Sequence, residues 1–101
     1  MTEPQLVLKM RKSLEKRGAC FAKIHGGQFG QRGVSDLLGV YRSYGIAIEV
    51  KLPGKEKNVT DLQRKFLDDW RTAGGVAIIA TSVAKVNRLL DAIDRRVDGV
   101  S

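Results

Sequence analysis

Hydrophobic residues recur at helical spacing near the N-terminus of the chain. Val7, Met10 and Leu14 fall on one face of a helix, while basic side chains fall elsewhere. Thr2 can cap the start of this helix, and a glycine such as Gly18 commonly follows the end of one. The pattern therefore predicts a first helix that begins after Thr2 and ends just before Gly18.

Short apolar segments bounded by glycine or turn residues predict four strands. In chain order they are Ala19–His25, Leu37–Tyr41, Gly45–Glu49 and Val76–Thr81. Only a short turn separates the second from the third, so these two are expected to pair as an antiparallel hairpin. The last segment is almost continuously apolar, which is typical of a strand covered on both faces. Cys20 is expected as a small buried residue of the first strand.

Two more helices are predicted in the second half of the chain. Thr60 and Gln63 have the spacing of a capping box, and Ser82 can cap the last helix. In the second helix the expected buried stripe is Leu62, Phe66 and Trp70, with Leu67 at its flank. The last helix has the clearest apolar stripe, formed by Val83, Val86, Leu89, Leu90, Ile93 and Val97.

The order helix, strand, strand, strand, helix, strand, helix predicts an α/β fold with a central mixed sheet, in a single domain over residues 1–101. No apolar run approaches the roughly 18 residues of a membrane span, and the N-terminus has no signal-peptide pattern. A cytoplasmic protein is therefore expected. A lone cysteine excludes an internal disulfide and argues against a zinc site.

The charge balance favours a polyanionic partner. The formal net charge is +7 and the isoelectric point is about 9.9. Each phosphate neutralised by lysine or arginine releases condensed counterions, which drives binding to nucleic acid. The basic residues are spread over every predicted element, which argues against an amphipathic membrane helix. The glycine-rich stretch at residues 26–33 lacks the Gly-Lys-Ser/Thr ending of a nucleotide-binding loop, which argues against ATP as a ligand.

Candidate chemistry lies in the predicted hairpin. Side chains alternate along a strand, so Glu49 and Lys51 point the same way, and antiparallel pairing brings Asp36 close to both. Two carboxylates with room for water suit Mg²⁺ or Mn²⁺, and a neighbouring lysine would orient or help deprotonate an attacking water. A structural ion pair between Glu49 and Lys51 is the alternative interpretation.

The segment Gly-Val-Ser-Asp36, the hairpin after it and Glu49-Val-Lys51 resemble the motif of the PD-(D/E)XK nuclease superfamily. The resemblance is closer to its small VRR-NUC branch, which is found in phage and bacterial proteins. The Pro-Asp of that family is Ser35-Asp36 here, which keeps the carboxylate but alters the turn before it. The order of elements also fits, so the resemblance covers nearly the whole chain and implies a PD-(D/E)XK nuclease-like core.

The resemblance implies a set of site residues. Those with a catalytic role would be Glu3, Asp36, Glu49, Lys51 and Gln63. The ligands of Mg²⁺ or Mn²⁺ would be Asp36, Glu49 and the backbone carbonyl of Val50. Two of these residues also have local explanations: Glu3 favours the N-terminal helix dipole, and Gln63 caps its helix.

Several residues are candidates for contact with nucleic acid. Lys23 matches a basic position in the family. The glycine-rich stretch at residues 26–33 adds Gln31 and Arg32, and the basic connection after Lys51 adds Lys55 and Lys57. For the loop lysines, ordinary solubilising charge is the alternative.

These features predict a metal-dependent endonuclease that hydrolyses DNA phosphodiester bonds. A chain this small makes a limited footprint on DNA, so a homodimer with two sites is expected. The resemblance extends to junction resolvases and points toward branched DNA such as Holliday junctions, with a nickase or a flap nuclease as the near alternative. The alternatives are a basic nucleic-acid-binding module without catalysis and, more remotely, an RNA-processing nuclease.

Overall fold

The computed structural model describes residues 1–24 and 33–99. Its helices and strands follow the predicted order, with one short 3-10 helix added before the second α-helix. The elements are α1 (Glu3–Lys16), β1 (Cys20–Lys23), β2 (Leu37–Tyr41), β3 (Tyr44–Val50), η1 (Glu56–Asn58), α2 (Asp61–Thr72), β4 (Val76–Ala80) and α3 (Val83–Asp98). The first strand is shorter than predicted, and residue 25 lies outside the described residues.

The strands form one mixed sheet in the order β1-β2-β3-β4. The first two pairings are antiparallel, and β3 pairs with β4 in parallel. The β2–β3 hairpin turns through Arg42 and Ser43, which both have positive φ, 48° and 74°. Two such residues make the tight turn whose twist matches that of the strands. The register is thereby fixed, with Leu37 opposite Ile48.

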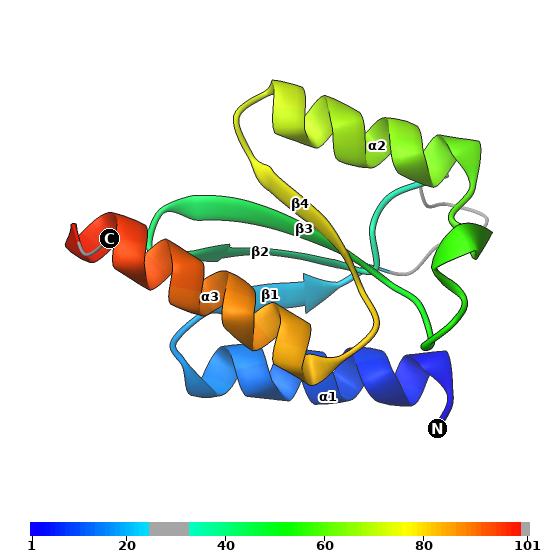
Figure 1. Cartoon of the computed structure of the whole chain (residues 1–101), viewed down its shortest axis with the longest axis horizontal. Coiled ribbons are helices and arrows are strands. Elements are labelled where there is room, and N and C mark those ends of the chain that lie inside the picture. Colours follow the sequence, from blue (N-terminus) through cyan, green and yellow to red (C-terminus); the bar gives the residue numbers. More distant parts are fainter. Residues whose placement is uncertain (25–32, 100–101) are drawn as a thin grey trace.

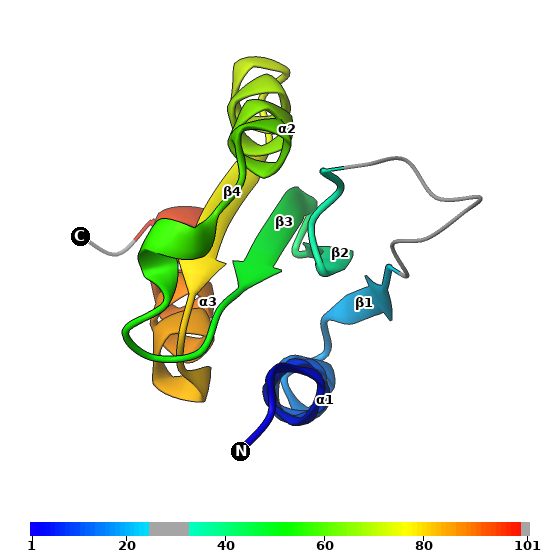
Figure 2. The ribbon, with the colours of Figure 1, turned by 90° about the vertical axis from the view of Figure 1, so that its right-hand side faces the viewer.

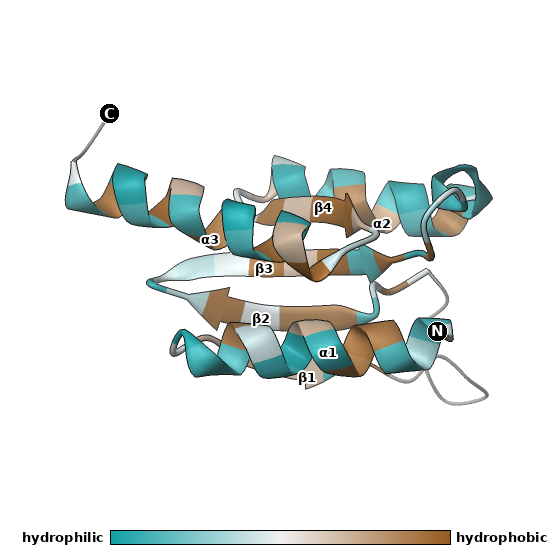
Figure 3. Ribbon diagram, turned by 60° about the horizontal axis from the view of Figure 1, so that its bottom comes forward, coloured by the Kyte–Doolittle hydropathy of each residue, from teal (hydrophilic) through white to brown (hydrophobic). Residues whose placement is uncertain are grey.

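Helices cover both faces of the sheet, as Figures 1 and 2 show: α1 and α3 lie on one side and α2 lies on the other. The larger core lies under α1 and α3 and includes Met10, Leu14, Ile48, Val86 and Leu90. In Figure 3 the strands between the helices are mainly brown and white, whereas much of the helices' length is teal. The alternation of apolar and polar positions in the sequence thus matches the layers of the fold.

The end of the hairpin that carries the tight turn is bound to α1 and α3 by a polar network around Asp94. Its carboxylate accepts hydrogen bonds from Tyr41 Oη at 2.6 Å, Arg42 Nη1 at 3.0 Å and Arg17 Nη2 at 3.1 Å. These donors hold the pKa of the Asp94 carboxyl below its usual value. The network fixes the hairpin against both helices, and the opposite end of the hairpin carries Asp36.

The prediction for the buried face of α2 was wrong at Leu62, and Leu67 lies at the centre of that face instead of at its flank. Leu67 is 1% exposed and belongs to the core, whereas Leu62 is 51% exposed. The residues that face the sheet are Gln63, Phe66, Leu67 and Trp70, which follow helical spacing. Successive helical residues are about 100° apart, so a stripe centred near Gln63 leaves Leu62 at its side.

The prediction that Cys20 is buried was also wrong, because its side chain is exposed. In β1 only Phe21 is buried, and Cys20 and Ala22 are exposed on the opposite face. The helix on that face, α2, packs on β3 and β4 and leaves β1 uncovered. Within the described residues, none of the helices has the length and apolar character needed to span a bilayer.

Candidate active site

The site lies where the β2–β3 hairpin opens. Asp36 directly precedes β2, and because Leu37 faces Ile48, the next position along the ladder brings Asp36 beside Glu49. The side chain of Asp36 is fixed by a hydrogen bond of 2.8 Å from the Val50 backbone N–H to Oδ2. Its backbone carbonyl accepts a second bond, also 2.8 Å, from the Ile24 N–H after β1. Hydrogen bonds to β3 and to the residue after β1 thus fix the position of Asp36 at the start of β2.

Glu49 is the buried carboxyl group of the site, with 1% of its surface exposed. Burial is the main reason that its pKa rises from 4.5 to about 9. A hydrogen bond with Asp36 and the negative charge of that residue act in the same direction, and Glu3 adds to the rise. The positive charge of Lys51 has the opposite effect. Burial and the neighbouring Asp36 carboxylate therefore favour the protonated form of Glu49 in the metal-free protein.

Gln63 serves its helix and the site at the same time. Its backbone N–H donates to Thr60 Oγ1 at 3.1 Å, and its Oε1 accepts from the Thr60 N–H at 2.9 Å, which completes a capping box. The other end of the same amide, Nε2, lies 3.5 Å from Glu49 Oε1. The helix cap and the orientation toward the site are therefore compatible, because they use different atoms of one amide.

Lys51 lies directly after β3, on the same face as Glu49, and is 9% exposed. Its backbone N–H donates to the Ala80 carbonyl at 3.1 Å, which prolongs the pairing of β3 with β4 to this residue. Among the ion pairs of the described residues, none joins Lys51 to Glu49. The alternative of a direct structural ion pair between them is thus absent from the structure.

Two buried oxygen atoms at the site have no hydrogen-bond partner within the described residues: Glu49 Oε2 and Ser35 Oγ. A buried polar atom without a partner is unfavourable, and such atoms concentrate at functional sites. Residues 1–24 and 33–99 contain no group of three or more His, Cys, Asp or Glu side chains placed to hold a metal ion. A cation here would have to combine the two carboxylates with backbone, water or substrate oxygens, which is the ligand set that Mg²⁺ accepts.

The remaining predicted residues are placed around this centre. Glu3 lies in the first turn of α1, and its charge acts on Glu49. Lys23 ends β1, and Lys55 and Lys57 lie at η1; all three are exposed. The predicted contacts Gln31 and Arg32 lie outside the described residues.

The sequence analysis missed Ser35 as a buried polar residue. It noted only that serine replaces proline before Asp36. Ser35 lies directly before Asp36 and outside the predicted strand, so no local pattern indicated that it would be buried. The sequence analysis also passed over Leu8 and Arg11 on α1, whose position relative to Lys23 depends on how α1 packs against β1.

No protein-family model and no curated protein matches the sequence. A solved structure described as a VRR_NUC domain is similar to 88% of this chain and to 94% of its own length, with a TM-score of 0.67 and 23% sequence identity. This chain has the fold of a VRR-NUC domain. The predicted α/β class with a central mixed sheet is therefore confirmed, and so is the resemblance at the level of the fold.

In this VRR-NUC fold the hairpin brings together residues that are 13 and 15 positions apart in sequence, Asp36 with Glu49 and with Lys51. The parallel strand β4 supports the far side of β3, and α2 supplies Gln63 from above the sheet. At this sequence identity the likeness concerns the fold, so the chemistry must be argued from the site itself.

Proposed function

We propose that this protein is a metal-dependent endonuclease that hydrolyses DNA phosphodiester bonds. The observation that carries the proposal is the buried Glu49, with an unpartnered Oε2, beside Asp36 and Lys51 in a VRR-NUC fold. A buried carboxyl group beside a second, half-buried one destabilises a fold unless a cation or proton joins them. Such an arrangement is typical of a functional site rather than of a scaffold.

The proposed metal ion is Mg²⁺ or Mn²⁺, held by Asp36, Glu49 and the backbone carbonyl of Val50. The donors fit these ions, which bind through a few carboxylates and complete their shell with water and phosphate oxygens. When bound, the ion would supply positive charge that favours ionised Glu49 and offsets the charge developing on the phosphate in the transition state.

The protein's own side chains would orient the reactants. The amino group of Lys51, on the same face as Glu49, would position the attacking water and, in its uncharged form, accept the proton of that water. The amide of Gln63, fixed by its capping box, would hold Glu49 or a water beside it. Glu3 would act at the edge of the site through its charge.

The net charge of +7 supports DNA as the substrate. Lys23, Lys55 and Lys57 are exposed near the site and would contact backbone phosphates, together with Gln31 and Arg32. We further propose a homodimer, because two sites related by a two-fold axis could make paired cuts in branched DNA such as a Holliday junction. With DNA as the substrate, the expected compartment is the cytoplasm of a bacterial or phage-infected cell.

The test compares the purified protein with Lys51→Met and Asp36→Asn on labelled DNA. The substrates are a four-way junction, a flap, a linear duplex and single-stranded DNA and RNA, each with Mg²⁺, Mn²⁺ or EDTA. Methionine keeps the packing of the lysine stem while removing the charge. Lys16→Met is the matched control, because Lys16 is exposed in the last turn of α1.

Cleavage should require the metal and should fall by about 10²–10⁴-fold in Lys51→Met, the contribution of a positioned proton-transfer group. Binding in EDTA should survive in this variant, and Lys16→Met should cut normally. Tight binding without cleavage in every condition would support the non-catalytic module instead. Preferential cleavage of RNA would support the RNA-processing alternative, and sedimentation of the free and DNA-bound protein would test the dimer.

A further inference from the structure

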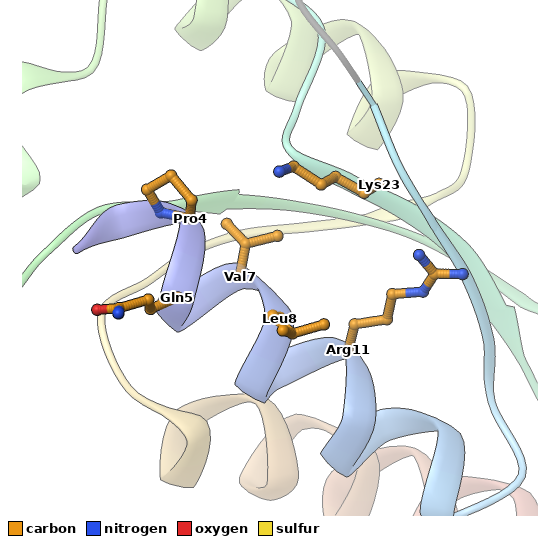
Figure 4. A pocket seen from close by; sticks show the side chains of 6 residues that line it. All are labelled: Pro4, Gln5, Val7, Leu8, Arg11 and Lys23. Carbon is orange, nitrogen blue, oxygen red and sulfur yellow. The ribbon is translucent and has the colours of Figure 1, made fainter. Parts of the chain in front are cut away.

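A pocket lies between the outer side of α1 and the end of β1. It has a volume of about 330 Å³ and is lined by Pro4, Gln5, Val7, Leu8, Arg11 and Lys23. Figure 4 shows Lys23 reaching from β1 over Val7, and Arg11 extending from the next turn of α1 toward the strand. Pockets that take small ligands start at roughly 300 Å³, so this one can accept a single compact group.

The lining combines an apolar floor with two cations. Pro4 and Leu8 are exposed and Val7 is buried, and Leu8 is 51% exposed although it is a large apolar residue. Arg11 uses Nε to bind Glu15 at 2.8 Å, and within the described residues its two terminal nitrogens have no hydrogen-bond partner. Lys23 forms no ion pair within residues 1–24 and 33–99. The pocket therefore offers apolar contact and cationic donors together.

The pocket lies on the α1 face of the sheet, at the same end of β1 and β2 as Asp36. Lys23 is followed by Ile24, whose N–H donates to the Asp36 carbonyl at 2.8 Å. Pro4 follows Glu3, whose charge acts on Glu49. A DNA strand with a phosphate at the active site would pass this end of the sheet, which brings a neighbouring nucleotide toward the pocket.

We propose that this pocket binds one unpaired nucleotide of the DNA strand next to the phosphate that is cut. Its base would lie on Leu8 and Val7, and its phosphate would bind Arg11 and Lys23. This assignment rests on the proposed function and gives it a substrate preference. A base in a continuous duplex is stacked and paired and cannot enter a pocket, whereas the end of a flap or a branch point can supply a free one.

The experiment measures DNA binding in EDTA by fluorescence anisotropy, so that cleavage plays no part. Each protein is titrated with a blunt duplex and with the same duplex carrying a short single-stranded flap. Leu8→Asn removes apolar contact and is matched by Val97→Asn, an exposed apolar residue in the last turn of α3. Lys23→Gln removes a cation and is matched by Lys16→Gln on the exposed surface of α1.

Leu8→Asn should weaken binding of the flap DNA by about fivefold or more, the lower range for contact with one base, and should leave the blunt duplex unchanged. Val97→Asn should change neither. Lys23→Gln should lower the slope of log K against log salt by about 1 on the flap DNA, and Lys16→Gln should not. Unfolding midpoints close to that of the parent protein would show that the variants are folded.

Equal effects of Leu8→Asn and Val97→Asn, or equal losses on flap and blunt DNA, would overturn the assignment of the pocket. That result could coexist with metal-dependent cleavage, which would leave the proposed function intact. Conversely, a selective loss on flap DNA in a protein that cuts nothing would retain the pocket as a nucleotide site and remove the nuclease.

Discussion

Replacing Glu49 by glutamine should raise the free energy of unfolding of the metal-free protein at neutral pH. The carboxyl group is 1% exposed, and burial and Asp36 raise its pKa from 4.5 to about 9. In the folded protein it keeps its proton, whereas in the unfolded chain it ionises. Glutamine has nearly the same shape and does not titrate. Its amide oxygen can still accept from Gln63 Nε2, as Glu49 Oε1 does.

The magnitude follows from the two pKa values. Between about pH 4.5 and 9 the unfolded chain binds fewer protons at this position than the folded protein, so the stability of the wild type falls as the pH rises. Each pH unit corresponds to about 1.4 kcal/mol, which gives a loss of about 1.4 kcal/mol at pH 5.5 and, as an upper value, about 4 kcal/mol at pH 7.5. Below pH 4.5 the loss disappears, because the unfolded chain is protonated as well.

The assay is urea unfolding in EDTA at these two pH values, followed by the fluorescence of the single tryptophan, Trp70. The other titrating groups are shared by both proteins, so the difference between variant and wild type isolates Glu49. This difference should favour the variant and grow by up to about 3 kcal/mol from pH 5.5 to 7.5. A difference that does not depend on pH, or a variant less stable than the wild type at pH 7.5, would refute the reasoning.

Three further substitutions test the site and its support, each by urea unfolding. Ser35→Ala removes a buried hydroxyl group that has no partner and should stabilise the protein by about 1 kcal/mol; a loss of stability would mean that the hydroxyl group is bonded. Gly39→Ala would drive Cβ into the Cys20 carbonyl oxygen and the Phe21 ring, so it should destabilise the sheet by about 3 kcal/mol or more; an unchanged midpoint would contradict this contact. Thr60→Ala removes the cap of α2 and should cost about 1 kcal/mol. It should also slow DNA cleavage by loosening Gln63, and unchanged cleavage would show that the cap does not position the amide.

Local patterns in the sequence were sufficient for most of the fold. The caps at Thr2 and Thr60 were predicted, and both form capping boxes, because such caps depend only on residues three positions apart. The hairpin was predictable for a similar reason, because only a short turn separates its two apolar strands. The structure shortens that turn to Arg42 and Ser43 and so sets the register, with Tyr41 opposite Tyr44.

Burial at the sheet edge and on α2 was not predictable. Cys20 is exposed because α2 covers β3 and β4 but not β1, and no local pattern specifies which strands a helix will cover. Leu62 is exposed and Leu67 is buried because contacts with the sheet set the rotation of α2 about its axis, and these contacts cannot be read from the helix sequence alone.

By itself the sequence determined the elements, their order and the pair of carboxylates with a lysine, because these follow from the spacing of side chains along one chain. Only the tertiary structure decided how deeply Glu49 is buried, that Gln63 reaches it while capping α2, and that α1 and β1 enclose a pocket beside them. The physical reason is that the pKa of a carboxyl group, and the access of a ligand to it, depend on atoms contributed by several distant segments. Their relative positions exist only once the helices have packed onto the sheet.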